Sequence, residues 1–251
     1  MRVLSALVAT CRDVGSDLTS LLLPLGCAGC GTWDVVVCRR CRGLWQQRPR
    51  RCESETVYLA AQDHPARPGL PVWALAPYRG GPRRMVLSWK GRSRTDLRPF
   101  FAAVGYGLGV AVGGELTRLL TGPAPPVLVL PAPSGWRRRL RRQLVVADLA
   151  RAVGAGLGST GHRVDVQDVL RTPDASLHRL GASARRTSRR VRLARRTDPR
   201  SLRTAVVLVD DVVTTGATLA ACRTLLREHG ANVAGAVVLA ATPGPGSATW
   251  Q

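Results

Sequence analysis

Two adjacent carboxylates and a hydroxyl-rich loop follow a short apolar run late in the chain. The run Val206–Val209 precedes Asp210 and Asp211, and a loop with three threonines and Gly216 comes next. The run predicts a strand buried on both faces of a parallel sheet, and the apolar spacing after the loop predicts a helix. Amide groups at a helix start bind phosphate, while paired carboxylates accept hydrogen bonds from a ribose diol. The segment therefore predicts a site for a 5-phosphorylated ribose, with Mg²⁺ relieving the remaining charge of the acids.

Two other phosphate-binding patterns are excluded. A P-loop nucleotidase also places an aspartate after an apolar strand, but Gly-x-x-x-x-Gly-Lys-Ser/Thr is absent, and the only lysine is Lys90. Residues 156–161 fit Gly-x-Gly-x-x-Gly, yet a predicted helix precedes them and a predicted strand follows. That order is the reverse of a dinucleotide-binding turn, so neither motif assigns a nucleotide.

Four of the seven cysteines form two Cys-x-x-Cys pairs separated by seven residues, with ligands Cys27, Cys30, Cys38 and Cys41. Each pair can supply two thiolates from one turn, and together they complete a tetrahedral, structural zinc site. Two disulfides or unrelated free thiols are the alternatives, and a cytoplasmic setting disfavours disulfides. Cys52 lacks a second cysteine at Cys-x-x-Cys spacing, and an alternate metal ligand is one interpretation of it. Cys11 and Cys222 are predicted to be small core residues.

The 251 residues carry a formal net charge of +21, and their number suits one α/β domain with a small module. This charge favours anionic partners such as nucleic acid, phosphorylated metabolites or acidic lipid. Arginine almost replaces lysine, which coding bias explains equally well, so charge alone does not establish DNA binding. Residues 99–114 are uncharged but too short for a bilayer, and they predict a core helix. Residues 3–23 predict an amphipathic helix, and we expect a cytoplasmic protein without membrane insertion.

Strand and helix patterns alternate through the rest of the chain. Strands are predicted at Val72–Ala76, Val127–Leu130, Val164–Leu170, Val206–Val209 and Asn232–Ala241. Helices are predicted at Arg83–Ser88, Trp136–Ala150 and Leu177–Arg196, and after the threonine loop. This alternation predicts an α/β fold with a parallel sheet flanked by helices. The expected organisation is an N-terminal helix (1–23), a zinc-binding module (24–55), a linker (56–71) and the main domain (72–251).

The segment from Val206 to Thr218 resembles the phosphoribosyl-diphosphate (PRPP) motif of type I phosphoribosyltransferases, in which an apolar run, two acids and Thr-Thr-Gly occur in this order. With the paired Cys-x-x-Cys upstream, the chain resembles the ComF family from about residue 24 to residue 241. That family joins a zinc knuckle of four cysteines to a type I phosphoribosyltransferase-like domain. Further segments that look like the family's are Tyr78–Gly81, Leu87–Arg92 and Val129–Pro133.

The resemblance implies binding of Mg-PRPP and transfer of its phosphoribosyl group to an unidentified acceptor with displacement of diphosphate, in nucleoside metabolism or DNA uptake (competence). The implied catalytic residues are Asp210, Asp211 and Lys90, with Lys90 and Arg139 beside the diphosphate unless they are merely solvated charges. The implied PRPP-binding residues are Asp210, Asp211, Val212, Val213, Thr214, Thr215, Gly216, Ala217, Thr218, Pro131, Ala132 and Arg139. The implied cofactors are structural Zn²⁺ and Mg²⁺ bound with PRPP.

Two departures from the family keep other functions open. Residues 139–144 lack the glycine and asparagine of the family's Arg-Gly-Phe-Asn-Gln stretch, and Ser188 replaces an asparagine of a later motif. If the replaced residues orient diphosphate or acceptor, the protein could be a non-catalytic PRPP sensor. It could also be a DNA-uptake accessory that binds single-stranded DNA or a helicase, although aromatic residues for base stacking are sparse.

Overall fold

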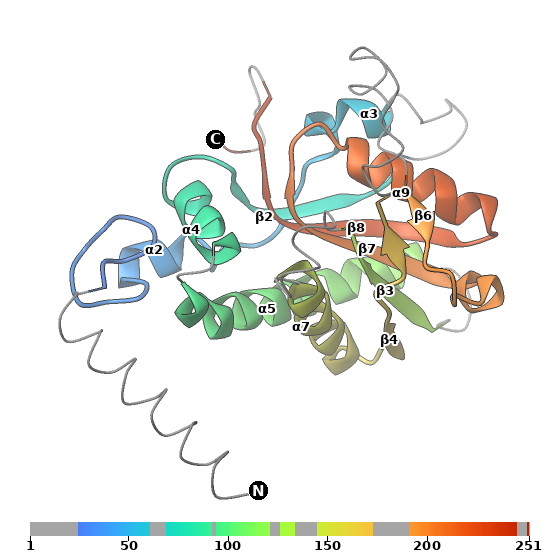
Figure 1. Cartoon of the computed structure of the whole chain (residues 1–251), viewed down its shortest axis with the longest axis horizontal. Coiled ribbons are helices and arrows are strands. Elements are labelled where there is room, and N and C mark those ends of the chain that lie inside the picture. The colour runs from blue at the N-terminus through green and yellow to red at the C-terminus, as the bar shows by residue number, and fades with distance from the viewer. Residues whose placement is uncertain are drawn as a thin grey trace, which may run out of the picture.

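A six-stranded sheet forms the centre of the molecule (Figure 1). The computed structural model describes residues 25–60, 69–91, 94–120, 126–133, 145–172, 191–244 and 250. Neighbouring strands are parallel except at the β1–β2 edge, which is antiparallel. This confirms the predicted α/β class. In spatial order the strands are β1 (Arg50–Arg51), β2 (Val72–Pro77), β8 (Asn232–Ala241), β7 (Ala205–Val213), β3 (Val127–Pro131) and β4 (Val164–Val166).

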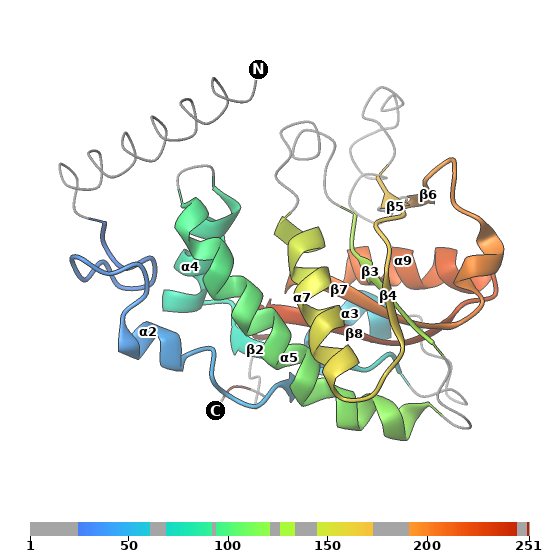
Figure 2. The ribbon, with the colours of Figure 1, turned by 90° about the horizontal axis from the view of Figure 1, so that it is seen from below.

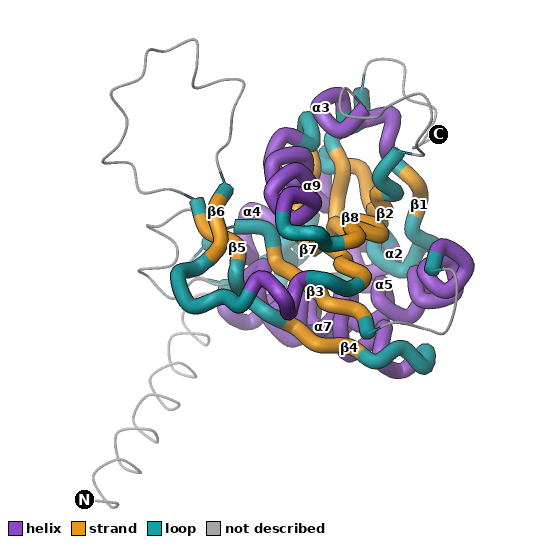
Figure 3. The backbone as a smooth tube through the Cα atoms, turned by 90° about the vertical axis from the view of Figure 1, so that its right-hand side faces the viewer, coloured by secondary structure: helices purple, strands orange, loops and turns teal. Residues whose placement is uncertain are grey.

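Helices cover both faces of the sheet, as the view along it shows (Figure 3). One face packs against α4 (Gly80–Lys90), α5 (Arg98–Leu119) and α7 (Val145–Ser159), and the other against α3 (Val57–Ala60) and α9 (Ala217–Glu228). Val207 and Val209 enter the first core, whereas Val206 and Leu208 enter the second. Burial on both faces is the reason that this strand is continuously apolar.

The remaining elements are short: α2 (Arg39–Gly43), η1 (Glu53–Glu55), η2 (Thr95–Leu97), η4 (Pro199–Leu202), β5 (Leu170–Arg171) and β6 (Arg192–Leu193). β5 and β6 form a separate antiparallel pair (Figure 2). The predicted strand 164–170 is therefore divided between β4 and β5. The predicted helix 177–196 is wrong at its end, because residues 192–193 pair with β5 instead of continuing a helix. Residues 173–190, like residues 1–24 and 134–144, lie outside the described residues.

The glycine-rich helix α5 packs closely against α7. A Cβ atom at Gly109 would lie 2.2 Å from the carbonyl oxygen of Val153, and one at Gly156 would lie 2.1 Å from that of Tyr106. By length and composition α5 is the one helix among the described residues that could cross a bilayer. In the structure, however, one side of it is buried on α7 and the sheet, as the prediction of a core helix over 99–114 requires.

The order of the strands creates a switch point between β3 and β7. From β3 the chain passes through α7 to β4, and from β7 it passes through α9 to β8 on the opposite side. The two helices consequently lie on opposite faces of the sheet (Figure 3). In open parallel sheets such a reversal leaves a crevice at the carboxyl ends of the two strands, and ligands bind in it.

Candidate functional site

A cavity of about 260 Å³ lies at that switch point. Ala132 and Pro133 border it after β3, and the segment 210–219 borders it from β7 into α9. Tyr78, Lys90 and Val146 complete the wall from β2, α4 and α7. The order of the strands and the acid-threonine motif therefore indicate the same binding site, although the first argument uses the sheet and the second uses the side chains of residues 210–218.

The strand that carries the two acids is longer than predicted. We expected it to end at Val209, but β7 continues to Val213 because β8 runs beside it in parallel and pairs with residues 210, 212 and 213. On the other side β3 ends at Pro131, opposite Val209, and the amide of Ala132 still donates to the Val209 carbonyl at 2.7 Å. The acid pair thus lies on a stretch of strand whose β3 side is open to the cavity.

The two acids face opposite sides of β7, as alternation along a strand requires. Asp211 is buried and forms an ion pair with Nζ of Lys90, at the end of α4. Asp210 is half-buried, and its carboxylate accepts a hydrogen bond from the Asp211 amide at 2.8 Å. Burial, followed by the charge of Asp210, raises the pKa of the Cys222 thiol in α9. Lys90 offsets the repulsion between adjacent carboxylates, which leaves Asp210 as the more accessible acceptor.

The threonine loop turns sharply at Gly216 and leads directly into α9. Gly216 has φ +76°, and a Cβ atom there would lie 2.9 Å from Cβ of Thr56. Thr214 and Thr215 are exposed, Thr218 is half-buried, and the first turn of α9 contains no acidic residue. The positive end of the α9 dipole, together with three hydroxyl groups, therefore borders the cavity, an arrangement that suits a phosphate.

A segment that we expected to be part of a linker supports this loop. The amide of Tyr58 in α3 donates to the Thr215 carbonyl at 3.1 Å, and Leu59 packs in the same core as α9. Glu55, just before α3, is buried and accepts a hydrogen bond from the Gly244 amide. Residues 56–59 therefore contact the loop from outside the domain boundary expected at residue 72. The domain boundaries themselves stay predictions.

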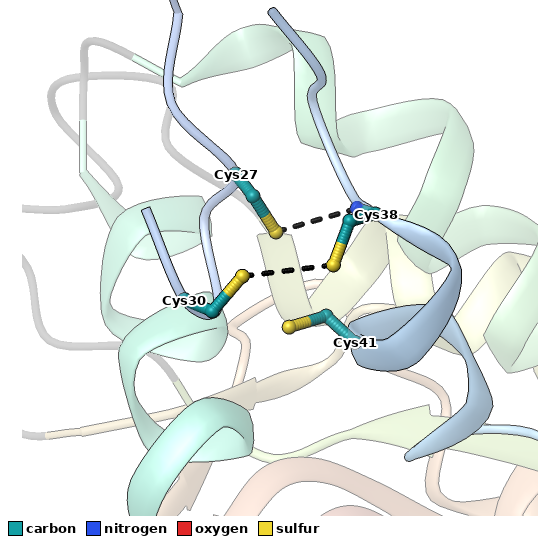
Figure 4. Close-up of side chains that lie close together, drawn as sticks. All are labelled: Cys27, Cys30, Cys38 and Cys41. Carbon is teal, nitrogen blue, oxygen red and sulfur yellow. Dashed lines mark hydrogen bonds between the residues drawn. The ribbon is translucent and has the colours of Figure 1, made fainter. Parts of the chain in front are cut away.

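The four paired cysteines meet in one cluster (Figure 4). Their sulfur atoms all lie within 4.8 Å of one another, and the Sγ atoms of Cys30 and Cys38 are 3.6 Å apart. Thiolates around a tetrahedral zinc ion lie about 3.8 Å apart, as Zn–S bonds of about 2.3 Å require. All four are free thiols, so the geometry fits a four-thiolate metal site and no disulfide.

Local contacts also suit metal binding. Burial opposes ionisation of Cys27, but hydrogen bonds from the backbone at Cys38, Cys30 and Gly29 lower its pKa to about 6. The hydroxyl and amide of Thr32 lower the pKa of the exposed Cys30. Thiolates are the form that binds zinc, so both shifts favour the metal. Four protein ligands leave no open coordination position, and such a site is structural.

The cysteine cluster is attached to the main domain rather than tethered beside it. Arg84 in α4 donates to the carbonyl oxygen of Gly29 at 2.6 Å, and Arg94 donates to that of Gly26 at 2.9 Å. The indole nitrogen of Trp45 contacts the Met85 sulfur at 3.2 Å. Cys27 and Cys41 are buried in the same core as Met85. The cluster and α4 therefore share one core.

Most, but not all, of the predicted site residues line the cavity. Residues 210–218, Lys90 and Ala132 line the cavity, whereas Pro131 is buried at the end of β3 and Arg139 lies outside the described residues. Four cavity residues were not in the predicted site: Tyr78, Pro133, Val146 and Leu219. Tyr78 and Pro133 lie in the segments 78–81 and 129–133 that resemble those of the ComF family, and this resemblance could have indicated them.

Cys52 lies apart from the cluster. It is buried in the core on the α9 side, and its thiol lies 3.4 Å from the Val72 carbonyl oxygen. Burial raises its pKa to about 12, with smaller contributions from the charges of Glu53 and Glu55. It therefore packs as a small core residue in this structure, and it is absent from the group of four sulfurs.

Comparison with known proteins identifies one match. Residues 167–248 match the family described as the phosphoribosyl transferase domain. The matched range includes β7, the acid pair, the threonine loop, α9 and β8. No curated protein matches the chain in sequence. The last third of the chain is thus similar to a phosphoribosyl transferase domain, which implies PRPP as substrate, and upstream of it lies a cluster of four cysteines that could hold zinc.

Proposed function

We propose that this protein binds Mg-PRPP in the cavity between β3 and β7 and transfers its phosphoribosyl group to an acceptor nitrogen, releasing diphosphate. The observation that carries this proposal is the convergence of an acid pair, a threonine loop and a helix start on one cavity at the switch point of the sheet. In the transfer, the bond from ribose C1 to diphosphate breaks as the acceptor lone pair forms the new bond to C1.

Each part of the cavity has a role in this proposal. The loop 214–218 and the start of α9 bind the 5-phosphate through hydroxyl and amide donors. Asp210 and Asp211 accept hydrogen bonds from the ribose hydroxyls, and Lys90 carries positive charge toward the departing diphosphate. Mg²⁺ bound with PRPP supplies further neutralisation of the diphosphate. The protein contributes positioning and electrostatics, without a covalent nucleophile.

The ComF assignment is part of the same proposal. A cluster of four cysteines, attached to α4 upstream of a phosphoribosyltransferase domain, supports it. A role in DNA uptake is proposed only on the basis of the ComF assignment. A cytoplasmic location is proposed on the same basis.

The test is calorimetric titration of the zinc-loaded protein with PRPP and Mg²⁺. The double variant Asp210→Asn/Asp211→Asn should lose about a hundredfold or more in affinity, because two charge-assisted hydrogen bonds to the ribose weaken. The matched control, Asp148→Asn/Glu228→Gln, makes the same charge change on exposed helix surface and should bind PRPP as the wild type does.

The outcomes separate the alternatives. Equal PRPP affinity in the acid-pair variant and the wild type would refute the site. Saturable binding without diphosphate release against a panel of nucleobases and amines would instead support the PRPP sensor. Binding followed by acceptor-dependent diphosphate release would establish the transferase.

A further inference from the structure

A second cavity, of about 520 Å³, lies between the cysteine cluster and α4. Its walls come from the cluster and α2 on one side and from the end of β2 and the first turns of α4 on the other. The cavity is distinct from the PRPP cavity, with which it shares no lining residue. Its volume is in the range that small ligands occupy.

Four arginines line this cavity, Arg40, Arg50, Arg79 and Arg84, and no acidic residue lines it. All four are exposed. Among the residues that the structure describes, Arg40, Arg79 and Arg84 form no ion pair with a carboxylate. Arg84 uses its Nε atom on the Gly29 carbonyl, which fixes the guanidinium in place. Planar guanidinium groups bind phosphate oxygens in pairs, so the cavity suits a multiply charged phosphate.

The same cavity has a flat aromatic side and an apolar floor. Trp250 lines it together with Leu44, Leu75, Pro77 and Pro82. The indole Nε1 of Trp250 is buried and has no hydrogen-bond acceptor among the described residues. A ligand that presents a flat ring would stack on the exposed part of this indole.

Neutralisation of the metal centre accounts for only part of this arrangement. A zinc ion with four thiolates leaves a net charge of about −2 beside Cys30 and Cys41. Arg40, Arg79 and Arg84 alone exceed that charge, and metal neutralisation does not require an aromatic wall. The surplus of positive charge indicates a second anion.

We propose that this arginine-lined cavity binds a nucleoside phosphate, with the base against Trp250 and the phosphates on the arginines. An acidic peptide is the competing ligand for a basic cavity, but carboxylate side chains would leave the aromatic wall unused. The site also has a route to the PRPP cavity, because α4 borders the arginine cavity at its start and carries Lys90 at its end.

The experiment measures ADP binding to the full zinc-loaded chain by calorimetry, with inorganic diphosphate as a second probe. Arg40→Gln/Arg79→Gln, which leaves the Arg84 contact with Gly29 in place, should weaken ADP binding by at least about tenfold, since charge-assisted hydrogen bonds are lost. The matched control, Arg118→Gln/Arg227→Gln, removes the same charge from exposed positions in the last turns of α5 and α9 and should change it less than about twofold.

Two further variants test whether the base contacts Trp250 and whether ADP binds in the arginine-lined cavity. Trp250→Ala should weaken ADP by about fivefold or more while leaving diphosphate binding unchanged, because only the base contacts the ring. Asp210→Asn/Asp211→Asn should leave ADP binding intact, whether or not PRPP itself binds.

Four results would overturn the proposal. One is equal loss of ADP affinity in the cavity and control variants, which indicates a non-specific effect of charge. Another is loss only in the acid-pair variant, which places ADP in the PRPP cavity. The third is absence of ADP binding at millimolar concentration. The fourth is displacement of diphosphate by an Asp/Glu-rich peptide and not by ADP.

Discussion

Gly216 forms the turn of the threonine loop. Its replacement by alanine should destabilise the protein in two ways, which can be measured separately. The first is conformational, because Gly216 has φ +76° and a left-handed backbone costs a non-glycine residue about 1–2 kcal/mol. The second is steric, because the new Cβ would lie 2.9 Å from Cβ of Thr56 and 3.4 Å from two carbon atoms of Leu59. Such overpacking typically costs about 1–3 kcal/mol. Gly216→Ala should therefore lower the free energy of unfolding by about 2–5 kcal/mol.

Gly230 provides a matched control at the other end of α9. Its φ is +78°, almost equal to that of Gly216, but a Cβ atom there would approach only the flexible side chain of Arg203, at 3.7 Å. Gly230→Ala should consequently show the conformational cost alone, about 1–2 kcal/mol. The difference between the two variants then measures the contact between the loop and the segment before α3.

Urea denaturation of the zinc-loaded protein measures both variants, and calorimetry with PRPP measures the consequence for the site. Gly216→Ala should weaken PRPP binding because the loop must move away from Thr56, while Gly230→Ala should leave binding unchanged. Thr56→Gly in the Gly216→Ala background should recover part of the steric loss. Equal free energies of unfolding in the two glycine variants would refute the inference that residues 56–59 hold the loop.

Three further predictions concern the packing, the acid pair and the thiols. Gly109→Ala should cost about 1–3 kcal/mol in urea denaturation because α5 and α7 must separate, whereas Gly107→Ala, with no atom within 4 Å, should stabilise α5 slightly. Lys90→Met should destabilise the protein by about 1–3 kcal/mol, since the buried Asp211 loses its ion pair; an unchanged urea midpoint would contradict this. In zinc-free protein at pH 7, iodoacetamide should modify Cys30 first, because it is exposed and its pKa is lowered. Peptide mass spectrometry would disprove that order if a buried thiol outside the cluster reacted earlier, and zinc should suppress the modification.

The parts of the site that could be predicted from sequence are those fixed by short-range pattern. The apolar run before the acids and the spacing of the cysteines each concern residues within one turn or one strand. The predicted strand ended too early because aspartate has a low propensity for strands, and Asp210 and Asp211 taken alone indicate a loop. In the structure the parallel ladder with β8 continues to Val213, and a long-range partner overrides the local preference of aspartate.

Long-range contacts account for what the sequence did not indicate. Lys90 was predicted as a diphosphate partner, but its ion pair with Asp211 depends on where α4 ends relative to β7. The contact of Tyr58 with the threonine loop joins segments more than 150 residues apart, and no periodicity reports such a contact. The end of the predicted helix 177–196 failed for the same reason, because β5 supplies a strand partner for residues 192–193.

Helix α4 connects the cysteine cluster to the ligand cavity. Its middle residue Arg84 donates to Gly29 between two of the cysteines, and its last residue, Lys90, reaches Asp211. A rigid helix transmits a displacement at one end to the other, so loss of the cluster geometry would move Lys90 relative to the acid pair. The cysteine cluster therefore has a physical reason to be attached at this position: it contacts the helix whose last residue, Lys90, pairs with an acid of the ligand cavity.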